Sequence, residues 1–327
     1  MATSTRQLGS SSSPNCFFTQ RVHAAKVSVD IARTKSGPMP TISANGIEIA
    51  YEVDGTGPPL LLVMGLGGQL TDWPQGFVAR LAENFRVIRF DNRDAGLSTF
   101  DSSPPPDRMS FVKARFGRGT VVPAYRLDDL AADTAGLLEA LDTPDAHIVG
   151  MSMGAMIAQL VTITRPEMVR TLTSIMSTTG NARVGQPSLR VLAYLARRET
   201  LSKSDAVAAT VELFKLIGGR DWDSAEQRGR TAASVARSFN PDGVLRQSLA
   251  IACADDRTEA LRKVAAPTLV VHGLDDTLVK PSGGQATAEA IPDARLLMFP
   301  RMGHDIPATR HLELVDAIVA HSKRQRR

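Results

Sequence analysis

The sequence contains little cysteine and no long apolar run. Only Cys16 and Cys253 occur among its 327 residues, so a framework of disulfide bonds is not expected and a reducing compartment is compatible. A membrane-spanning helix needs about 18 to 20 consecutive apolar residues, whereas the apolar run at 60–70 is short and interrupted by glycine. We therefore expect a soluble protein without a membrane span.

A strong excess of one charge is also missing. The 38 Lys and Arg residues exceed the 34 Asp and Glu residues by only 4, and much of this excess lies near the two ends of the chain. Because the interior has no net basic bias, nucleic acid is not an expected partner. The composition leaves a homodimer open.

The two ends differ in composition from the rest of the chain. Residues 1–39 are rich in Ser, Thr and Arg, with Asp30 as the acidic residue, and 323–327 are mostly basic. We interpret 1–39 as a disordered leader or an over-extended start, and 323–327 as a basic tail. The expected location is cytoplasmic, or organellar if residues 1–39 act as a transit peptide.

The remainder predicts one large α/β domain. Two β-like segments, 41–44 and 47–53, joined by Asn45-Gly46, predict a hairpin with a tight turn. Further strand-like apolar segments alternate with helical patterns, which is typical of a parallel sheet covered by helices on both faces; these segments are 60–64, 86–90, 146–150, 169–176, 267–272 and 295–299.

Between 180 and 263 only helical patterns occur. Because strand and helix alternation stops there and resumes afterwards, this segment reads as an insertion. We therefore predict a core formed by 40–179 and 264–322, with an inserted helical cap at 180–263.

A candidate nucleophile follows the strand at 146–150. Gly150-Met151-Ser152-Met153-Gly154 leads at once into an apolar helix at 156–164, which is the strand, sharp turn and helix that a nucleophile elbow requires. The elbow lifts the serine oxygen off the sheet edge, and the glycines Gly150 and Gly154 allow the backbones to approach closely. Because glycine and serine are common residues, the motif alone is weak evidence for a nucleophile, and the strand, the helix and the other candidate residues have to support it.

A serine hydroxyl needs a base to take its proton and an acid to orient that base. His304 follows the last predicted strand, in a loop that can reach the carboxyl edge of the sheet, where sites form. The strand at 267–272 ends in a turn containing Asp275 and Asp276, and sequence spacing leaves either one as the acid. The order serine, aspartate, histidine is that of an α/β-hydrolase.

The developing charge on a carbonyl oxygen needs backbone N–H donors. Met153, directly after the serine, and Leu66, in the glycine-rich loop 64–68, are the candidates for this oxyanion hole. The same loop lacks the spacing of a phosphate-binding motif. No metal and no organic cofactor are expected.

Together these motifs resemble the α/β-hydrolase superfamily over 41–322, and more narrowly the branch that includes aclacinomycin methylesterase. The matching stretches are 62–68, 87–98, 147–155, 267–279 and 302–307. The resemblance implies a mostly parallel eight-stranded sheet with flanking helices and an inserted helical cap. It also assigns the acid to Asp276, the third residue after the strand-end glycine. The sequence departs from the family pattern at Met64, where many members have histidine, and at Asp94, where glycine is usual.

The function predicted is hydrolysis of a small or medium-sized apolar ester through an acyl-enzyme on Ser152, with His304 as base and Asp276 as its orienting acid. A carbon–carbon bond hydrolase and a cofactor-free haloperoxidase-like enzyme of the same fold keep serine at the elbow and remain alternatives. Haloalkane dehalogenases and epoxide hydrolases have aspartate there, so Ser152 argues against them. A ligand-binding member without catalysis is the alternative from a different class.

Overall fold

The computed structural model describes Met1 and residues 39–116, 121–197 and 202–324. Almost all of the predicted leader at 1–39, including Cys16, lies outside the described residues, as do the last three positions of the predicted basic tail. Residues from Met39 onward form one compact unit.

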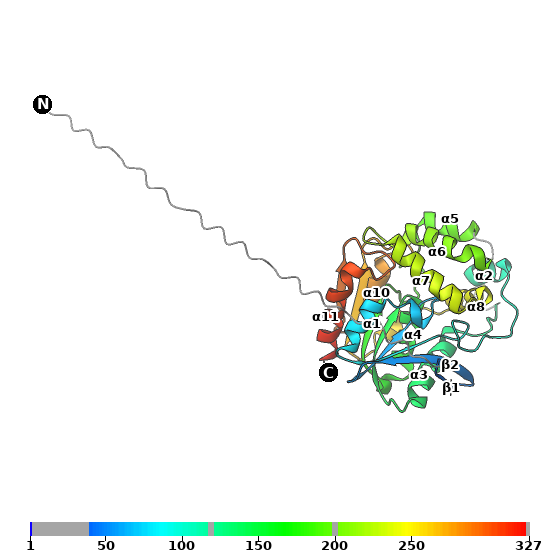
Figure 1. Ribbon diagram of the computed structural model, residues 1–327, viewed down its shortest axis with the longest axis horizontal. Coiled ribbons are helices and arrows are strands. Elements are labelled where there is room, and N and C mark those ends of the chain that lie inside the picture. Colours follow the sequence, from blue (N-terminus) through cyan, green and yellow to red (C-terminus); the bar gives the residue numbers. More distant parts are fainter. Residues whose placement is uncertain (2–38, 117–120, 198–201, 325–327) are drawn as a thin grey trace. The chain divides into compact units, whose positions relative to one another are not determined.

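The centre of the fold is a mostly parallel sheet (Figure 1). Within the described residues it has eight strands in the order β1-β2-β4-β3-β5-β6-β7-β8, and only the pairings of β2 with β1 and with β4 are antiparallel. The strands are β1 Thr41–Ala44, β2 Ile47–Asp54, β3 Pro59–Val63, β4 Arg86–Phe90, β5 Ala146–Met151, β6 Val169–Ile175, β7 Thr268–Gly273 and β8 Arg295–Phe299.

The predicted hairpin is confirmed. Ala44 pairs with Ile47, and the two residues between them, Asn45 and Gly46, have φ values of 48° and 78°. Positive φ at both central positions characterises the tight turn that suits the twist of paired strands, and asparagine followed by glycine adopts it at low cost.

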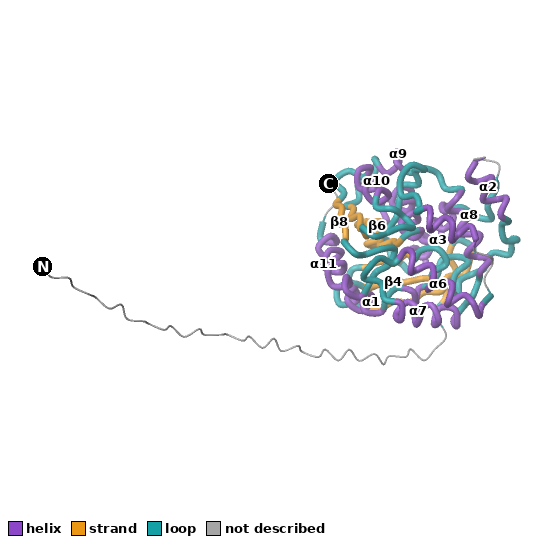
Figure 2. The backbone as a smooth tube through the Cα atoms, turned by 90° about the horizontal axis from the view of Figure 1, so that it is seen from above, coloured by secondary structure: helices purple, strands orange, loops and turns teal. Residues whose placement is uncertain are grey.

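The helices cover both faces of the sheet. They are α1 Gln75–Ala82, α2 Arg108–Phe116, α3 Leu127–Ala140, α4 Met153–Thr164, α5 Leu189–Arg197, α6 Lys203–Ile217, α7 Ser224–Arg237, α8 Pro241–Ala252, α9 Thr258–Leu261, α10 Ser282–Ala290 and α11 His311–Ser322. One apolar core lies between the sheet and α3 and α4, and a second lies between the sheet and α1 and α11. Figure 2 shows α1 and α10 on opposite sides of the strands.

Strand β3 shows that the sheet is covered on both faces. Leu60, Leu61 and Leu62 are completely buried, and they divide alternately between the two cores. A continuous apolar run is what a strand needs when both of its faces are covered. Because β3 to β8 are parallel, the residues that follow them lie at the same edge of the sheet.

Helices α5 to α9 all lie between β6 and β7 in the chain, as the helical patterns at 180–263 predict. Figure 1 shows α5, α6, α7 and α8 gathered on one side of the sheet. Two details differ from expectation. Helix α4 begins at Met153 rather than near 156, directly after the elbow, and α2, which follows Pro104, Pro105 and Pro106, was not predicted from the sequence.

No helix among the described ranges combines the length and apolar character needed to cross a bilayer.

Candidate active site

Ser152 occupies a strained turn between β5 and α4. Its φ of 57° and ψ of −120° lie outside the regions that L-residues prefer. The turn is held by its own hydrogen bonds: the Ser152 N–H donates to Ile175 O at 2.8 Å, and the Ser177 hydroxyl donates to Ser152 O at 2.9 Å. The surrounding backbone thus maintains a conformation that presents the serine side chain at the sheet edge.

The two elbow glycines are required by close packing. A Cβ on Gly150 would lie 2.3 Å from Gly154 O, and a Cβ on Gly154 would lie 2.0 Å from Val63 O. Both distances are far below contact distance and involve backbone atoms, which cannot move aside. Helix α4 therefore crosses directly over β5 and β3 only because these two positions lack side chains.

Three side chains from three separate loops meet at this edge. The Ser152 hydroxyl lies 3.0 Å from His304 Nε2, and His304 Nδ1 lies 2.7 Å from Asp276 Oδ2. Ser152 follows β5, Asp276 follows β7 and His304 follows β8, so the parallel strands deliver all three to the same end of the sheet. The structure brings together the residues that the sequence named.

Asp276 is buried, and both of its carboxylate oxygens have hydrogen-bond partners. Its Oδ1 accepts hydrogen bonds from the backbone N–H groups of Leu278 and Val279, both at 2.9 Å. Burial by itself raises the pKa of Asp276, but attraction to His304 and hydrogen bonds from His272 and His304 outweigh it, so the pKa lies below its ordinary value. The carboxyl is thereby kept ionised to accept from the His304 Nδ1–H.

Asp275, the other aspartate of this turn, is differently placed. Its carboxylate accepts from Arg220 Nε at 2.7 Å and from Arg220 Nη2 at 3.1 Å. It therefore binds the loop after α6 rather than the histidine. Of the two aspartates that sequence spacing left open, only Asp276 is hydrogen-bonded to His304 within the described residues.

Of the two residues predicted to form the oxyanion hole, Met153 follows Ser152 in the chain and Leu66 follows a residue that approaches Ser152. Met153 is the first residue of α4, where helix N–H groups lack an acceptor within the helix. Leu66 lies in the glycine-rich loop, whose neighbour Gly65 approaches the nucleophile: a Cβ built on Gly65 would lie 3.2 Å from the Ser152 Cβ. Both predicted donors are thus in the immediate neighbourhood of Ser152.

The helical segment supplies contacts that the sequence did not predict. At the end of α6, the Ile217 carbonyl accepts from the His304 N–H at 2.6 Å, and the Leu216 carbonyl accepts from the Thr277 hydroxyl at 2.6 Å. The last carbonyls of a helix lack partners within the helix, and here they hold the histidine and aspartate loops. Backbone acceptors leave no signature in a sequence, so no pattern could have revealed them.

A buried ion pair joins the helical segment to the turn after β4. Asp94 accepts from Arg246 of α8 at 2.8 and 2.9 Å and from the Tyr125 hydroxyl at 2.7 Å. Although burial alone raises the pKa of Asp94, the bonds from Arg246 and Tyr125 keep it below the ordinary value. Asp94 has a φ of 67°, and its carboxylate anchors α8 through Arg246.

Asp305, next to the histidine, is buried with one carboxylate oxygen unpartnered among the described residues. It is only 4% exposed, and its Oδ1 has no hydrogen-bond partner among the described residues. Burial raises the pKa of the Asp305 carboxyl to about 7, although the charge of Arg230 and the Gly303 N–H oppose the shift. The folded protein therefore binds a proton here that the unfolded chain releases near its ordinary pKa of 3.8.

We expect Asp305→Asn to remove a pH-dependent loss of stability. A raised carboxyl pKa contributes stability that is present below the unfolded pKa and is lost as pH rises to about 7. The free energy of unfolding of the variant, relative to the original protein, should therefore rise by about 2 to 3 kcal/mol between pH 5 and pH 8. Urea unfolding at both pH values measures this difference.

Asp275→Asn is the matched control, because the pKa of Asp275 is lowered rather than raised by its bond to Arg220. Its relative stability should not rise between pH 5 and pH 8. An Asp305→Asn difference that is the same at both pH values would show that the carboxyl is already ionised in the folded protein at pH 5.

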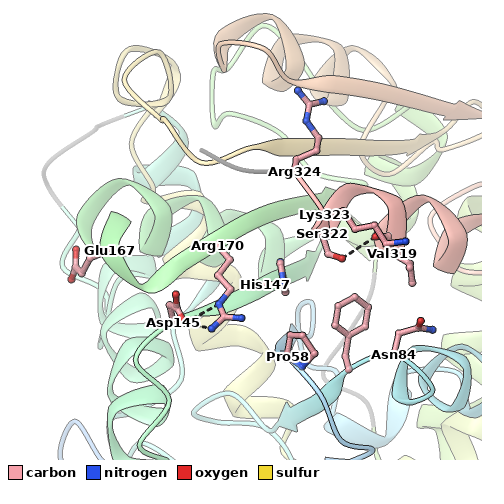
Figure 3. A pocket seen from close by; sticks show the side chains of 11 residues that line it. Pro58, Asn84, Asp145, His147, Glu167, Arg170, Val319, Ser322, Lys323 and Arg324 are labelled. Carbon is pink, nitrogen blue, oxygen red and sulfur yellow. Dashed lines mark hydrogen bonds and ion pairs between the residues drawn. The ribbon is translucent and has the colours of Figure 1, made fainter. Parts of the chain in front are cut away.

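A cavity of about 680 Å³ lies away from these residues. Figure 3 shows its lining, in which His147 lies beside the ion pair of Asp145 and Arg170. Asp145 precedes β5 and Ser152 follows it, so the six residues of this strand place the cavity roughly 20 Å from the serine at about 3.3 Å per residue. The cavity opens at the amino ends of the parallel strands and is not part of the candidate site.

No group of three or more His, Cys, Asp or Glu side chains suited to holding a metal ion occurs in the part of the chain that the structure describes. The groups available for chemistry at the sheet edge are the hydroxyl of Ser152, the imidazole of His304, the carboxylate of Asp276 and the nearby backbone N–H groups.

Comparison with known proteins agrees with the fold. A family model described as alpha/beta hydrolase fold matches residues 58–310. The chain belongs to the α/β-hydrolase family. The fold class predicted from the sequence, with its eight-stranded mostly parallel sheet and flanking helices, is confirmed.

Two curated relatives are similar to this α/β-hydrolase over most of its length. It is 28% identical over 311 residues to rhodomycin D methylesterase DauP of Streptomyces sp. (strain C5), covering 87% of this chain and 99% of that protein. It is 32% identical over 262 residues to BpoC of Mycobacterium tuberculosis (strain CDC 1551 / Oshkosh), provisionally named a non-heme bromoperoxidase, covering 79% of this chain and 91% of that protein. The predicted resemblance to a methylesterase branch is confirmed.

Among solved structures, the enol-lactonase from Burkholderia xenovorans LB400 superimposes with a TM-score of 0.66 at 21% identity, covering 87% of this α/β-hydrolase and 100% of that chain. At this identity the likeness concerns the fold alone.

Proposed function

We propose that this protein is a serine carboxylic-ester hydrolase that works through an acyl-enzyme. The observation that carries the proposal is the continuous chain from Ser152 Oγ to His304 Nε2 and from His304 Nδ1 to Asp276 Oδ2, at 3.0 and 2.7 Å. Methylesterases among the relatives support ester hydrolysis. A small or medium-sized apolar ester is the proposed substrate class.

In the proposed first half-reaction, the Ser152 hydroxyl gives its proton to His304 Nε2 as its oxygen attacks the ester carbonyl carbon. The Leu66 and Met153 N–H groups donate to the oxyanion that forms. When the tetrahedral intermediate collapses, the bond to the alcohol oxygen breaks and His304 returns the proton to that oxygen. The alcohol leaves and the acyl group remains on Ser152.

In the second half-reaction, His304 removes a proton from water as the water oxygen attacks the acyl carbon, and then returns the proton to Ser152 Oγ. The carboxylic acid is released and the enzyme is regenerated. Asp276 stays ionised throughout and stabilises the imidazolium that forms in each half. Every step uses groups of the protein and water.

We also propose that the helical segment at 180–263 is the cap of this hydrolase. The support is its contact with two parts of the site, through α6 to the His304 loop and through α8 to the turn after β4. A cap held in this way would cover the substrate and would set the size of the ester that fits.

A second candidate reaction uses the same groups. The relative provisionally named as a bromoperoxidase favours it. In that reaction hydrogen peroxide, rather than water, would take the acyl group from Ser152 and form a peracid, which would oxidise bromide.

The test is an assay of the purified protein against p-nitrophenyl esters from acetate to a long acyl chain and against methyl esters, together with labelling by a fluorophosphonate probe. We expect hydrolysis and labelling of a single serine, and the dependence on acyl length will describe the pocket. Adding peroxide and bromide tests the second candidate. If folded protein neither hydrolyses nor labels, the proposal is wrong, and carbon–carbon bond hydrolysis or ligand binding replaces it.

A further inference from the structure

Residues Gly65 to Gly68 of the glycine-rich loop form a tight turn whose N–H groups point in different directions. The Gly68 N–H donates to Gly65 O at 3.2 Å, which closes the turn, and Gly67 has a φ of 66°. In a trans peptide the C=O and N–H point in opposite directions. With Gly65 O directed into the turn, the N–H of the same peptide, that of Leu66, is directed out of it.

The Gly67 N–H of this turn is hydrogen-bonded to the helical segment. The Gly67 N–H donates to Gln247 Oε1 at 2.8 Å, across 180 residues of sequence. Gln247 lies on α8 and is completely buried. Its other amide atom, Nε2, donates to Arg93 O at 2.7 Å. One side chain therefore ties α8 to both the glycine-rich loop and the turn after β4.

The other side-chain hydrogen bonds to this loop, within the described residues, act before and after the turn rather than on it. The Asn92 side chain donates to Met64 O at 2.9 Å, and the Leu70 N–H donates to Asp91 Oδ1 at 2.7 Å. Between these two points, the hydrogen bond that the Gly67 N–H donates to the Gln247 side chain is the one side-chain bond that reaches the turn in the described part of the chain. Without it, Val244 of α8 would still pack against Gly67, but the Gly67 N–H would lose the acceptor that fixes its direction.

We propose that Gln247 is a positioning residue for the oxyanion hole. By holding the Gly67 N–H it keeps the turn in the one arrangement that aims the Leu66 N–H outward beside Ser152. Helix α8 thereby connects the helical segment to stabilisation of the transition state. This inference rests on the proposed ester hydrolysis.

Gln247→Leu removes the acceptor while keeping most of the volume. We expect kcat for p-nitrophenyl butyrate to fall on the order of 10 to 100-fold, less than or about equal to the loss of an oxyanion donor, with KM changed less than about threefold because ground-state binding does not use the oxyanion. The inhibition constant of a trifluoromethyl ketone, which forms a tetrahedral adduct on serine, should rise in parallel. Gln247→Asn, too short to reach Gly67 but still polar, should behave similarly and guards against misfolding of the leucine variant.

Asn240→Ala is the matched control. Asn240 caps α8 by accepting from the Gly243 N–H at 3.0 Å and donates to Asp94 O at 3.1 Å, so it ties α8 to the turn after β4 but does not contact the glycine-rich turn in the described structure. It should lower the denaturation midpoint and leave kcat and the inhibition constant within about threefold. The inference is overturned if both Gln247 variants keep the original kcat and inhibition constant, or if Asn240→Ala lowers kcat as much as they do. An inactive, unlabelled original protein would instead overturn the proposed function.

Discussion

Replacing Ser152 by alanine should lower kcat/KM for p-nitrophenyl esters by roughly 10⁴ to 10⁶-fold and abolish fluorophosphonate labelling. In the proposed mechanism the Ser152 hydroxyl oxygen attacks the ester and carries the acyl group, and this oxygen lies 3.0 Å from His304 Nε2. The remaining groups would still bind the ester and polarise its carbonyl, which explains why a small residual rate is expected. Initial rates and intact-protein mass after labelling measure both effects.

The control for this change is Ser248→Ala. Ser248 is a partly buried serine of α8 whose hydroxyl donates to Val244 O within the helix, and its loss should leave activity and labelling nearly unchanged. The Ser152→Ala protein should also unfold at nearly the original denaturant concentration, because alanine bears the same backbone strain at φ 57°. Retained hydrolysis in folded Ser152→Ala would show that the nucleophile is elsewhere.

Asp276→Asn should lower kcat by about 10⁴-fold while changing the fold little. The reason lies in the two backbone N–H groups of Leu278 and Val279, which both donate to Oδ1. They will keep the oxygen of the asparagine amide at that position and direct its NH₂ group toward His304 Nδ1. The imidazole must then carry its proton on Nε2, where it donates to Ser152 instead of accepting from it.

Asp275→Asn separates this effect from a general disturbance of the turn. The Asp275 carboxylate binds Arg220 and does not touch His304, so its replacement should change kcat less than about threefold, as is usual for an exposed ion pair. Steady-state kinetics of the two variants decide the question that spacing left open. A large loss in Asp275→Asn together with a small one in Asp276→Asn would reverse the assignment.

The sequence was most informative where one local pattern specifies one local structure. Asn45-Gly46 between alternating segments predicts a hairpin turn, and the structure has both residues at positive φ. Gly150 to Gly154 after an apolar strand predicts an elbow, and Ser152 occupies it. No sequence pattern was assigned to α2, the helix that begins at Arg108 shortly after three consecutive prolines.

In the candidate site, too, the sequence predicted some residues and left one choice open. The types of residue and their order along the chain were enough to name Ser152 and His304, because catalysis by serine requires a base and parallel strands bring their carboxyl ends to one edge. The choice between Asp275 and Asp276 was different, since neighbouring residues have the same composition and nearly the same spacing. Resemblance to a family favoured Asp276, and the direction of each side chain in the turn places it on His304.

By itself, then, the sequence determined the α/β-hydrolase fold, the elbow and the kinds of group at the site, because these depend on patterns within about 10 to 20 consecutive residues. Only the tertiary structure decided how the helical segment holds them: Ile217 O on the His304 N–H, Arg246 on Asp94 and Gln247 on Gly67. Each of these contacts joins residues far apart in the chain, and two use backbone atoms that every residue possesses. Such pairings depend on how the elements pack, and that packing leaves no local pattern in the sequence.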